Sequence, residues 1–537
     1  MKKIFVPFIL IVNVMLSYSQ TLELKKLSTG TEVYSSALFE QDDVYGYFYI
    51  FNKDKLGKTE NLYEYVLLDK NLNKVCNGEF SDKAVYQNIN YFYCRYVDNF
   101  ILINIDECDY TRRYYLMNTR FRILDIKENN LSDVFTLTPE LTKKYGFLDK
   151  KSKERMIIRF SNSPFGYGVA SSLRTYDKQD KISYLPEKYF FTDAQFNPLW
   201  SYSYNEHASS KNYESVRAAT NISYRNKKDV VAVFKSLLGR DNIKQEIKGN
   251  FKNSYIFLEK EGGKQISEIF PFTSTGTGKE KRADLRTNKI FVDRDNDKVT
   301  CINTTSQSND YILDEELIQG FSKVDYSLSE GKELKRDYFV WTQLSDYLNI
   351  DKYGYIREKD EPNCYLYLHN VLMKNNGNLV FILEEYKPLI AIPLILFTGV
   401  AINDLFFMEL DSDLKLIHLQ RISKEKKTIR RDGMDTKGSQ LSKYGYFDYA
   451  GSQDLGNDNY LFYYYNKQKP ESGGKKQWIL GIISYIDGKF SEQKLPLKSE
   501  DGSNMAIIPA KKGYLLVYET FKDKDRSPEL RLEKINY

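Results

Sequence analysis

The stretch Phe406-Phe407-Met408-Glu409-Leu410 leads directly into Asp411-Ser412-Asp413, and this succession of apolar run and polar turn recurs along the chain. Apolar and aromatic residues favour strands, whereas Asp, Asn and Gly are common in tight turns. Each occurrence therefore predicts a strand, a turn and a returning strand. The turns begin at seven positions: Asp69, Asp125, Asp193, Glu259, Ser329, Asp411 and Asp487.

Successive turns lie 56 to 82 residues apart. A β-propeller blade typically takes about 40 to 50 residues, so a propeller with this spacing would carry long loops. Stacked β-sandwiches are the alternative, although their repeats would be less regular. We predict a single all-β domain over residues 20–537, a β-propeller with very little helix. Seven blades match the seven turns, with six or eight as the neighbouring options.

The two ends of the chain carry strand patterns that suit each other. Thr21-Leu22-Glu23-Leu24-Lys25 alternates polar and apolar residues, and so does Leu530-Arg531-Leu532-Glu533-Lys534-Ile535. Because an open sheet edge invites misassembly, propellers commonly complete their last blade with a strand from the other terminus. We therefore predict that these N- and C-terminal strands pair and close the propeller.

The composition agrees with a folded sheet protein. The chain has 537 residues, of which 42% are hydrophobic and 15% aromatic, with 78 Lys and Arg against 73 Asp and Glu. That much apolar material excludes a disordered chain, and the aromatic share favours strands. The formal net charge of +5 argues against a nucleic-acid-binding protein.

The N-terminus has the layout of a signal peptide. Lys2 and Lys3 precede the apolar run Ile4–Leu16, and Ser17 and Ser19 supply small residues at the expected cleavage positions. We predict that residues 1–19 are removed, so that the mature chain is exported to the periplasm, the outer surface or the medium.

One internal apolar run, Leu389–Ile402, is too short to cross a membrane as a helix. A buried pair of strands is the preferred interpretation and an exposed interaction loop the second, so we predict no transmembrane span. The five cysteines match no zinc or disulfide framework.

The C-terminal third resembles a group of uncharacterised exported proteins of Gram-negative bacteria with β-propeller-like repeats. The resemblance rests on Leu405–Lys415, Asn459–Asn466 and Gly481–Lys489. It implies a propeller-like fold and an exported location, but no activity and no catalytic residue.

Metal ligands and general bases are scarce. The three histidines, His207, His369 and His418, have no metal-ligand spacing, and each is expected to be a surface or hydrogen-bonded structural residue. The cofactor prediction is none, except for calcium at Asp293, Asp295 and Asp297, which resemble the first half of an oxygen-rich calcium loop. A solvated hairpin turn is the alternative there.

Carboxylate pairs offer the other route to catalysis. Glu384-Glu385 and Asp314-Glu315-Glu316 could serve glycoside hydrolysis, although adjacent acidic residues also arise by chance. The densest basic run, Lys424–Arg431, is expected to be a solvated loop rather than a site for anionic glycans or lipids.

These observations predict a non-catalytic binding or scaffold protein whose partner is a protein or glycan at the cell envelope. Tyr444, Tyr446 and Tyr449 are the binding candidates, because tyrosines offer large contact area with few rotatable bonds; ordinary strand packing is the competing interpretation for them. The alternative function is a propeller-type carbohydrate-active hydrolase that uses paired carboxylates.

Overall fold

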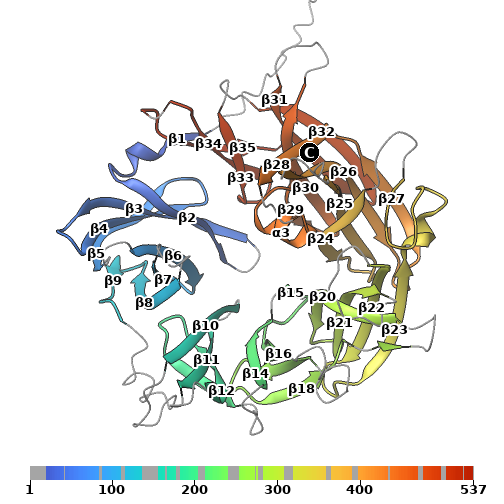
Figure 1. Cartoon of the computed structure of the whole chain (residues 1–537), viewed down its shortest axis with the longest axis horizontal. Helices are drawn as coiled ribbons and strands as arrows, with labels where there is room; N and C mark the ends of the chain where they lie inside the picture. Colours follow the sequence, from blue (N-terminus) through green and yellow to red (C-terminus); the bar gives the residue numbers. More distant parts are fainter. Residues whose placement is uncertain are drawn as a thin grey trace, which may run out of the picture. The chain divides into compact units, whose positions relative to one another are not determined.

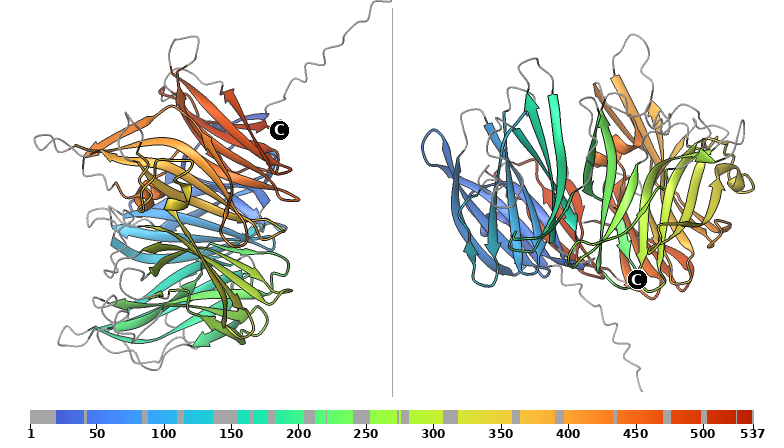
Figure 2. Two further views of the ribbon diagram at one scale, coloured as in Figure 1. Left: turned by 90° about the vertical axis from the view of Figure 1, so that its right-hand side faces the viewer. Right: turned by 90° about the horizontal axis from the view of Figure 1, so that it is seen from below.

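The computed structural model describes residues 20–40, 43–83, 88–109, 115–135, 155–163, 166–176, 182–203, 212–219, 221–239, 253–272, 274–275, 282–306, 318–357, 364–389, 397–432, 436–469, 476–497, 503–523 and 525–535. The predicted signal peptide, His207 and the acidic cluster at 314–316 lie outside these ranges. The described residues form eight sheets (Figures 1 and 2), most of them with four strands, and neighbouring strands are antiparallel except for one short parallel pair in the fifth sheet.

The chain divides into two compact units, and the smaller one is built from both ends of the chain. It holds the first and the eighth sheet. The first sheet consists of β2 (Thr31–Glu40), β3 (Asp43–Lys55), β4 (Glu60–Asp69) and β5 (Lys74–Lys83). The eighth consists of β33 (Asn504–Ile508), β34 (Tyr514–Thr520), β35 (Glu529–Lys534) and β1 (Gln20–Glu23), with the 3-10 helix η1 (Leu24–Lys26) after β1.

The larger unit holds the second to seventh sheets. The second contains β6 (Asn88–Val97), β7 (Phe100–Asp109), β8 (Tyr115–Asp125) and β9 (Asn130–Leu131); the third contains β10 (Arg155–Ser163), β11 (Gly166–Tyr176), β12 (Ile182–Thr192) and β13 (Pro198–Ser203). The fourth contains β14 (Asn212–Ala218), β16 (Val230–Gly239), β17 (Ser254–Glu259) and β18 (Gln265–Ile269). The fifth contains β20 (Arg282–Asp293), β21 (Lys298–Ser306), β22 (Gly320–Ser327) and β23 (Glu333–Val340), and β15 (Ile222–Tyr224) and β19 (Ser274–Thr275) pair with β20.

The last two sheets of this unit carry the region of interest below. The sixth contains β24 (Tyr365–Met373), β25 (Leu379–Leu389), β26 (Phe397–Leu410) and β27 (Leu416–Ile422), and β28 (Lys427–Asp432) also pairs with β26. The seventh contains β29 (Tyr449–Gly456), β30 (Asn459–Gln468), β31 (Gln477–Ile486) and β32 (Lys489–Pro496). Two short helices precede β24 and β29, η5 (Trp341–Leu344) and α3 (Gly438–Lys443).

These sheets are the blades of a β-propeller, which confirms the predicted all-β fold. There are eight of them among the described residues, one of the two neighbouring counts that the sequence left open. All seven predicted turns join the third strand of a blade to its fourth. The eighth blade has no such turn, because its fourth strand is β1 from the other end of the chain.

The predicted closure is confirmed by the pairing of β1 with β35. Gln20 lies opposite Leu532, and Glu23 lies opposite Glu529, in an antiparallel register. The strand ends at Glu23, two residues earlier than the alternation suggests, because Leu24–Lys26 turns into η1.

Apolar side chains fill the spaces between neighbouring blades of the larger unit. In the larger unit, Phe321 of the fifth blade contacts Phe381 of the sixth, with ring centroids 4.9 Å apart. Phe407 of the sixth blade contacts Phe462 of the seventh, with centroids 4.7 Å apart. Because both faces of a blade are covered, the central strand β25 is apolar without alternation through Leu383, and it pairs with β26 across the run Leu389–Ile402. At the described ends of that run Leu389 pairs with Gly399, as the strand-pair interpretation predicts, and residues 390–396 lie outside the described ranges.

Three of the third-to-fourth strand turns have one geometry, in which an Asp is followed three positions later by a buried apolar residue with positive φ. The three apolar residues are Leu72 (φ 65), Phe196 (φ 68) and Leu414 (φ 62). In the sixth blade, the Oδ1 atom of Asp411 accepts hydrogen bonds from the backbone N–H groups of Asp413 (2.8 Å) and Lys415 (2.9 Å). A left-handed conformation costs a bulky residue about 1–2 kcal/mol, and burying a leucine gains about as much or more. The burial of Leu414, which is 1% exposed, therefore offsets the free-energy cost of its positive φ.

No helix in the described ranges is long and apolar enough to cross a membrane.

Candidate functional site

The densest cluster of ionisable side chains lies between the sixth and seventh blades, and it begins on β25. Val380 and Ile382 of this strand pack against residues of the seventh blade, including Phe462. Because side chains alternate along a strand, Glu384 points in the same direction, and it is completely buried.

A break in the outer edge of the sixth blade brings a lysine to this glutamate. Both β27 and β28 pair with β26, and residues 423–426 connect them. The side chain of Lys424 has no solvent exposure, and its Nζ atom lies 3.0 Å from Oε1 of Glu384 and 2.7 Å from Oδ2 of Asp448. One ammonium group thus joins a carboxylate of each blade.

Further groups form hydrogen bonds or ion pairs with the two carboxylates. The backbone N–H groups of Asp448 and Tyr449 donate to Glu384 at 3.1 and 3.2 Å. Lys427 Nζ lies 3.0 Å from Oδ1 of Asp448. The Nε2 atom of His369 on β24 lies 2.9 Å from Oε2 of Glu384, so this nitrogen carries the proton. We refer to His369, Glu384, Lys424, Lys427 and Asp448 as the ionic cluster.

Mutual pairing keeps Glu384 and Lys424 charged despite their burial. Burial would raise the pKa of Glu384, but the Lys424 ammonium and the hydrogen bond from His369 outweigh it and lower that pKa to about 2. Burial would likewise lower the pKa of Lys424, and its two carboxylate partners raise it instead. Such pairs are costly to desolvate, so removing one member is expected to be far more damaging than never having formed the pair.

The neighbouring carboxylate, Glu385, points to the opposite face of β25. Its Oε2 atom accepts from the backbone N–H of Asp404 at 3.4 Å and lies 3.9 Å from Nη2 of Arg421, which also binds Asp404. A pair of glycosidase carboxyls must flank one bond about 5–9 Å apart. Glu384 and Glu385 are separated by the sheet itself, so they do not form such a pair.

Aromatic rings surround the histidine of the cluster. The His369 ring makes edge contacts with Tyr367 (5.1 Å) and Phe447 (4.8 Å) and a tilted contact with Tyr449 (4.8 Å). Burial raises the pKa of Tyr449 to about 12. These rings limit the access of water to the His369–Glu384 pair, which strengthens it.

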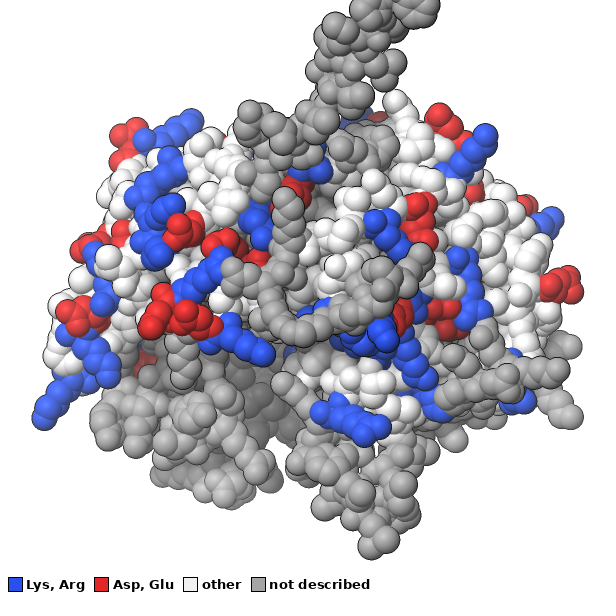
Figure 3. Space-filling model, turned by 90° about the horizontal axis from the view of Figure 1, so that it is seen from above, with Lys and Arg blue, Asp and Glu red and all other residues white. Residues whose placement is uncertain are grey.

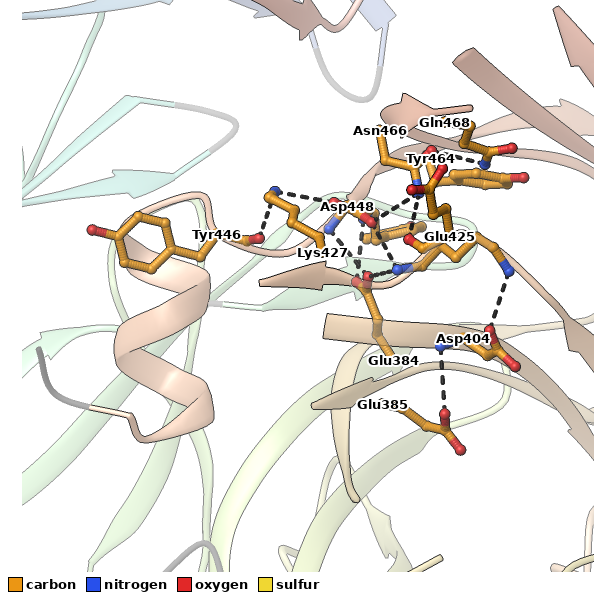
Figure 4. A network of polar contacts seen from close by, with 12 residues as sticks. Glu384, Glu385, Asp404, Glu425, Lys427, Tyr446, Asp448, Tyr464, Asn466 and Gln468 are labelled. Carbon is orange, nitrogen blue, oxygen red and sulfur yellow. Dashed lines mark hydrogen bonds and ion pairs between the residues drawn. The ribbon is translucent and has the colours of Figure 1, made fainter. Parts of the chain in front are cut away.

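The three tyrosines proposed for binding do not share one face. Tyr444, at the C-terminal end of α3, is 59% exposed. The ring of Tyr446 points away from the ionic cluster, while its carbonyl oxygen accepts from Lys427 at 2.8 Å (Figure 4). Tyr449 packs against His369. Strand packing therefore describes Tyr449 better, and Tyr444 remains the accessible candidate.

The proposed calcium residues lie in and beside the turn between β20 and β21, where each has a partner. Asp293 accepts hydrogen bonds from groups of its own turn. Asp295 pairs with Lys227 at 2.9 Å, and Asp297 accepts from the backbone N–H of Ser329 at 2.7 Å. Within the described ranges no three His, Cys, Asp or Glu side chains are grouped so that they could hold a metal. Calcium binding at this turn stays a prediction.

One sequence-based expectation about the cluster needs correction. Lys424 was expected in a solvated loop, yet its side chain is buried; the exposed members of the same run, such as Lys426 and Arg430, do fit that expectation. His369 is the structural histidine that was expected, but the sequence did not indicate its partners. A usable signal exists in Glu384-Glu385, because these two acids directly follow five apolar residues in a strand whose two faces are both covered.

Surface charge is mixed. On the face drawn in Figure 3, the described acidic and basic side chains are interspersed. This agrees with the near balance of charges in the sequence.

Four-stranded antiparallel blades in succession, with a last blade completed by the N-terminal strand, define the class of this protein as a β-propeller. The ionic cluster joins two of its blades. The chain belongs to the family of unknown function DUF6770, whose model matches residues 1–536. Among curated proteins none matches the chain.

Several solved structures are distantly similar. A europium-containing methanol dehydrogenase is 10% identical, with 96% of this chain and 95% of that one covered and a TM-score of 0.36. The β-propeller domain of the trilobed protease from Pyrococcus furiosus is 9% identical, with 84% and 97% covered and a TM-score of 0.31. Prolyl oligopeptidase B from Galerina marginata is 9% identical, with 92% and 56% covered and a TM-score of 0.33. Similarities of this size carry no argument about activity or ligands.

Proposed function

We propose that this protein acts after export as a non-catalytic binding or scaffold protein at the cell envelope, where its loops engage a protein or a glycan. The observation that carries the proposal is that the ionic cluster links the sixth blade to the seventh. Its two carboxylates have no solvent exposure: Glu384 is paired with Lys424 and hydrogen-bonded to His369, and Asp448 is paired with Lys424 and Lys427. Groups that could perform acid–base catalysis are thus committed to joining two blades.

Two blades joined in this way form a rigid scaffold, which suits loops that bind a partner. Rigid scaffolds tolerate variation in the loops they carry, and binding residues commonly lie on such loops. Tyr444 offers an exposed aromatic ring beside this scaffold, with Tyr446 at a centroid distance of 6.0 Å and Lys443 Nζ 5.9 Å from the Tyr444 ring. An aromatic ring with an adjacent cation suits contacts with protein or sugar surfaces.

A binding experiment tests the proposal. The purified mature chain would be titrated against immobilised peptidoglycan, lipopolysaccharide and a glycan array, and compared with the Tyr444→Ala and Tyr347→Ala variants. Tyr347 is a matched control because its ring is also exposed, at 65%. We expect saturable binding that Tyr444→Ala weakens at least threefold and Tyr347→Ala leaves unchanged.

The same protein would be incubated with glycoside, peptide and phosphoester substrates. Turnover that is abolished by replacing a single carboxylate would overturn the non-catalytic proposal in favour of the hydrolase. Fractionation of the native cells tests location, and recovery of the protein only from the cytoplasm would overturn the envelope assignment.

A further inference from the structure

The predicted mature chain begins at Gln20, which is also the first described residue and lies in β1. Gln20 lies opposite Leu532 in the closing blade, and both Gln20 and Thr21 are exposed. An N-terminal glutamine has a reactivity that an internal one lacks, so the predicted cleavage has a chemical consequence.

We propose that Gln20 is a modification site, at which the mature N-terminus cyclises to pyroglutamate. This inference rests on the proposed export, because cyclisation needs the free α-amine that cleavage after Ser19 creates. The α-nitrogen attacks the side-chain amide carbon, a C–N bond forms, the bond from that carbon to Nε2 breaks, and ammonia leaves with the proton. The product is a neutral lactam, and no oxidant or other co-reactant is consumed.

The register of β1 shows which hydrogen bond cyclisation changes. The backbone N–H of Leu24 donates to the carbonyl oxygen of Pro528 at 3.0 Å. In an antiparallel ladder such hydrogen-bonded pairs recur every second residue, so Leu22 with Leu530 and Gln20 with Leu532 are pairs of the same kind. In the lactam the side-chain carbon Cδ takes the place on the nitrogen that it has in proline, so Gln20 loses its ladder donor. The pairs of Leu22 with Leu530 and of Leu24 with Pro528 keep theirs, so cyclisation changes only the end of the closing strand.

The surroundings of Gln20 accept the modification. Since its side chain is exposed, closing the ring displaces no packed neighbour. Cyclisation also removes the positive charge of the amine from the end of the strand, and it seals the terminus of the closing strand against aminopeptidases, which need a free amine.

Mass spectrometry of the full-length protein isolated from the membrane and periplasmic fractions of its native cells tests this directly. Trypsin should release residues 20–25, and we expect this peptide about 17 Da lighter than its unmodified form, the mass of one ammonia. A synthetic peptide of the same sequence, carried through the same digestion, measures the cyclisation caused by handling and should stay mainly unmodified. Treatment with pyroglutamyl aminopeptidase should then expose Thr21.

The outcomes separate this inference from the proposed export. A peptide that begins at Gln20 with a free amine, in a fraction no less than that of the synthetic control, overturns the modification and leaves the cleavage intact. A chain that retains residues 1–19, or begins elsewhere, overturns the proposed processing as well. The Gln20→Ala variant is the matched control, since it should be cleaved at the same bond and keep its amine.

Discussion

Replacing Lys424 by methionine tests the ionic cluster most directly, because the side chain keeps its length and loses its charge. In the native protein Lys424 Nζ lies 3.0 Å from Glu384 and 2.7 Å from Asp448, with no exposure of any of the three side chains. Breaking a buried pair by removing one partner typically costs about 3–5 kcal/mol. Since His369 still faces Glu384 and Lys427 still faces Asp448, we expect the lower end of that range, about 3 kcal/mol.

The assay is urea unfolding followed by tryptophan fluorescence, together with hydrogen exchange of peptides from β25 and β29. Exchange is needed because a chain of this size need not unfold in one step. Lys426→Met is the matched control in the same loop, and its exposed side chain should change stability by less than about 0.5 kcal/mol. The double variant Glu384→Gln/Lys424→Met should recover part of the loss, because it removes an unpaired buried charge. If Lys424→Met were as stable as Lys426→Met, the reasoning about the cluster would be wrong.

Three further predictions concern acidity, a turn and the closing strand. Because the pKa of Glu384 is lowered from 4.5 to about 2, its stabilisation should be complete above about pH 4.5 and decline as the pH falls toward 2; the difference in urea midpoint between wild type and Glu384→Gln should shrink over that window, and a constant difference would contradict it. Leu414→Ala should destabilise by about 2–4 kcal/mol, and Leu414→Gly should be no worse despite its smaller side chain, because glycine accepts the positive φ of 62 without strain; thermal unfolding of the two variants decides whether the backbone contributes. Leu22→Pro removes an N–H that faces Leu530 and should cost about 1–3 kcal/mol more than Thr21→Pro, whose N–H points away from β35; equal midpoints in urea would show that the register argument is wrong.

The blade pattern could be predicted from the sequence because third strands end at recognisable turns such as Asp411 and Asp487. The number of turns favoured seven blades, one fewer than the eight described, and the reason is topological. A turn marks two strands that are consecutive in sequence, and the pair β35 with β1 is not. The alternating segments Thr21–Lys25 and Leu530–Ile535 were the local trace of the eighth blade.

The ionic cluster was less accessible to sequence reasoning. His369, Glu384, Lys424 and Asp448 are distributed over 80 residues, and apart from Glu384, which follows an apolar run, each alone has the appearance of an ordinary surface residue. Burial of Lys424 depends on a break between β27 and β28, which is set by the pairing of both with β26. Such a tertiary contact has no periodicity that could be read in advance.

The pairing of the two ends also sets the timing of folding. Gln20 and Leu532 are about 500 residues apart, so β1 leaves the ribosome long before its partner exists. At a synthesis rate of about 5–20 residues per second, the delay is roughly 25–100 s. During that time β1 has no native neighbour in the closing blade, and β2 to β5 lack the apolar contacts with β34 and β35 that complete their core. The first blade is therefore the part of the chain that most needs protection from aggregation while synthesis continues, although it is made first.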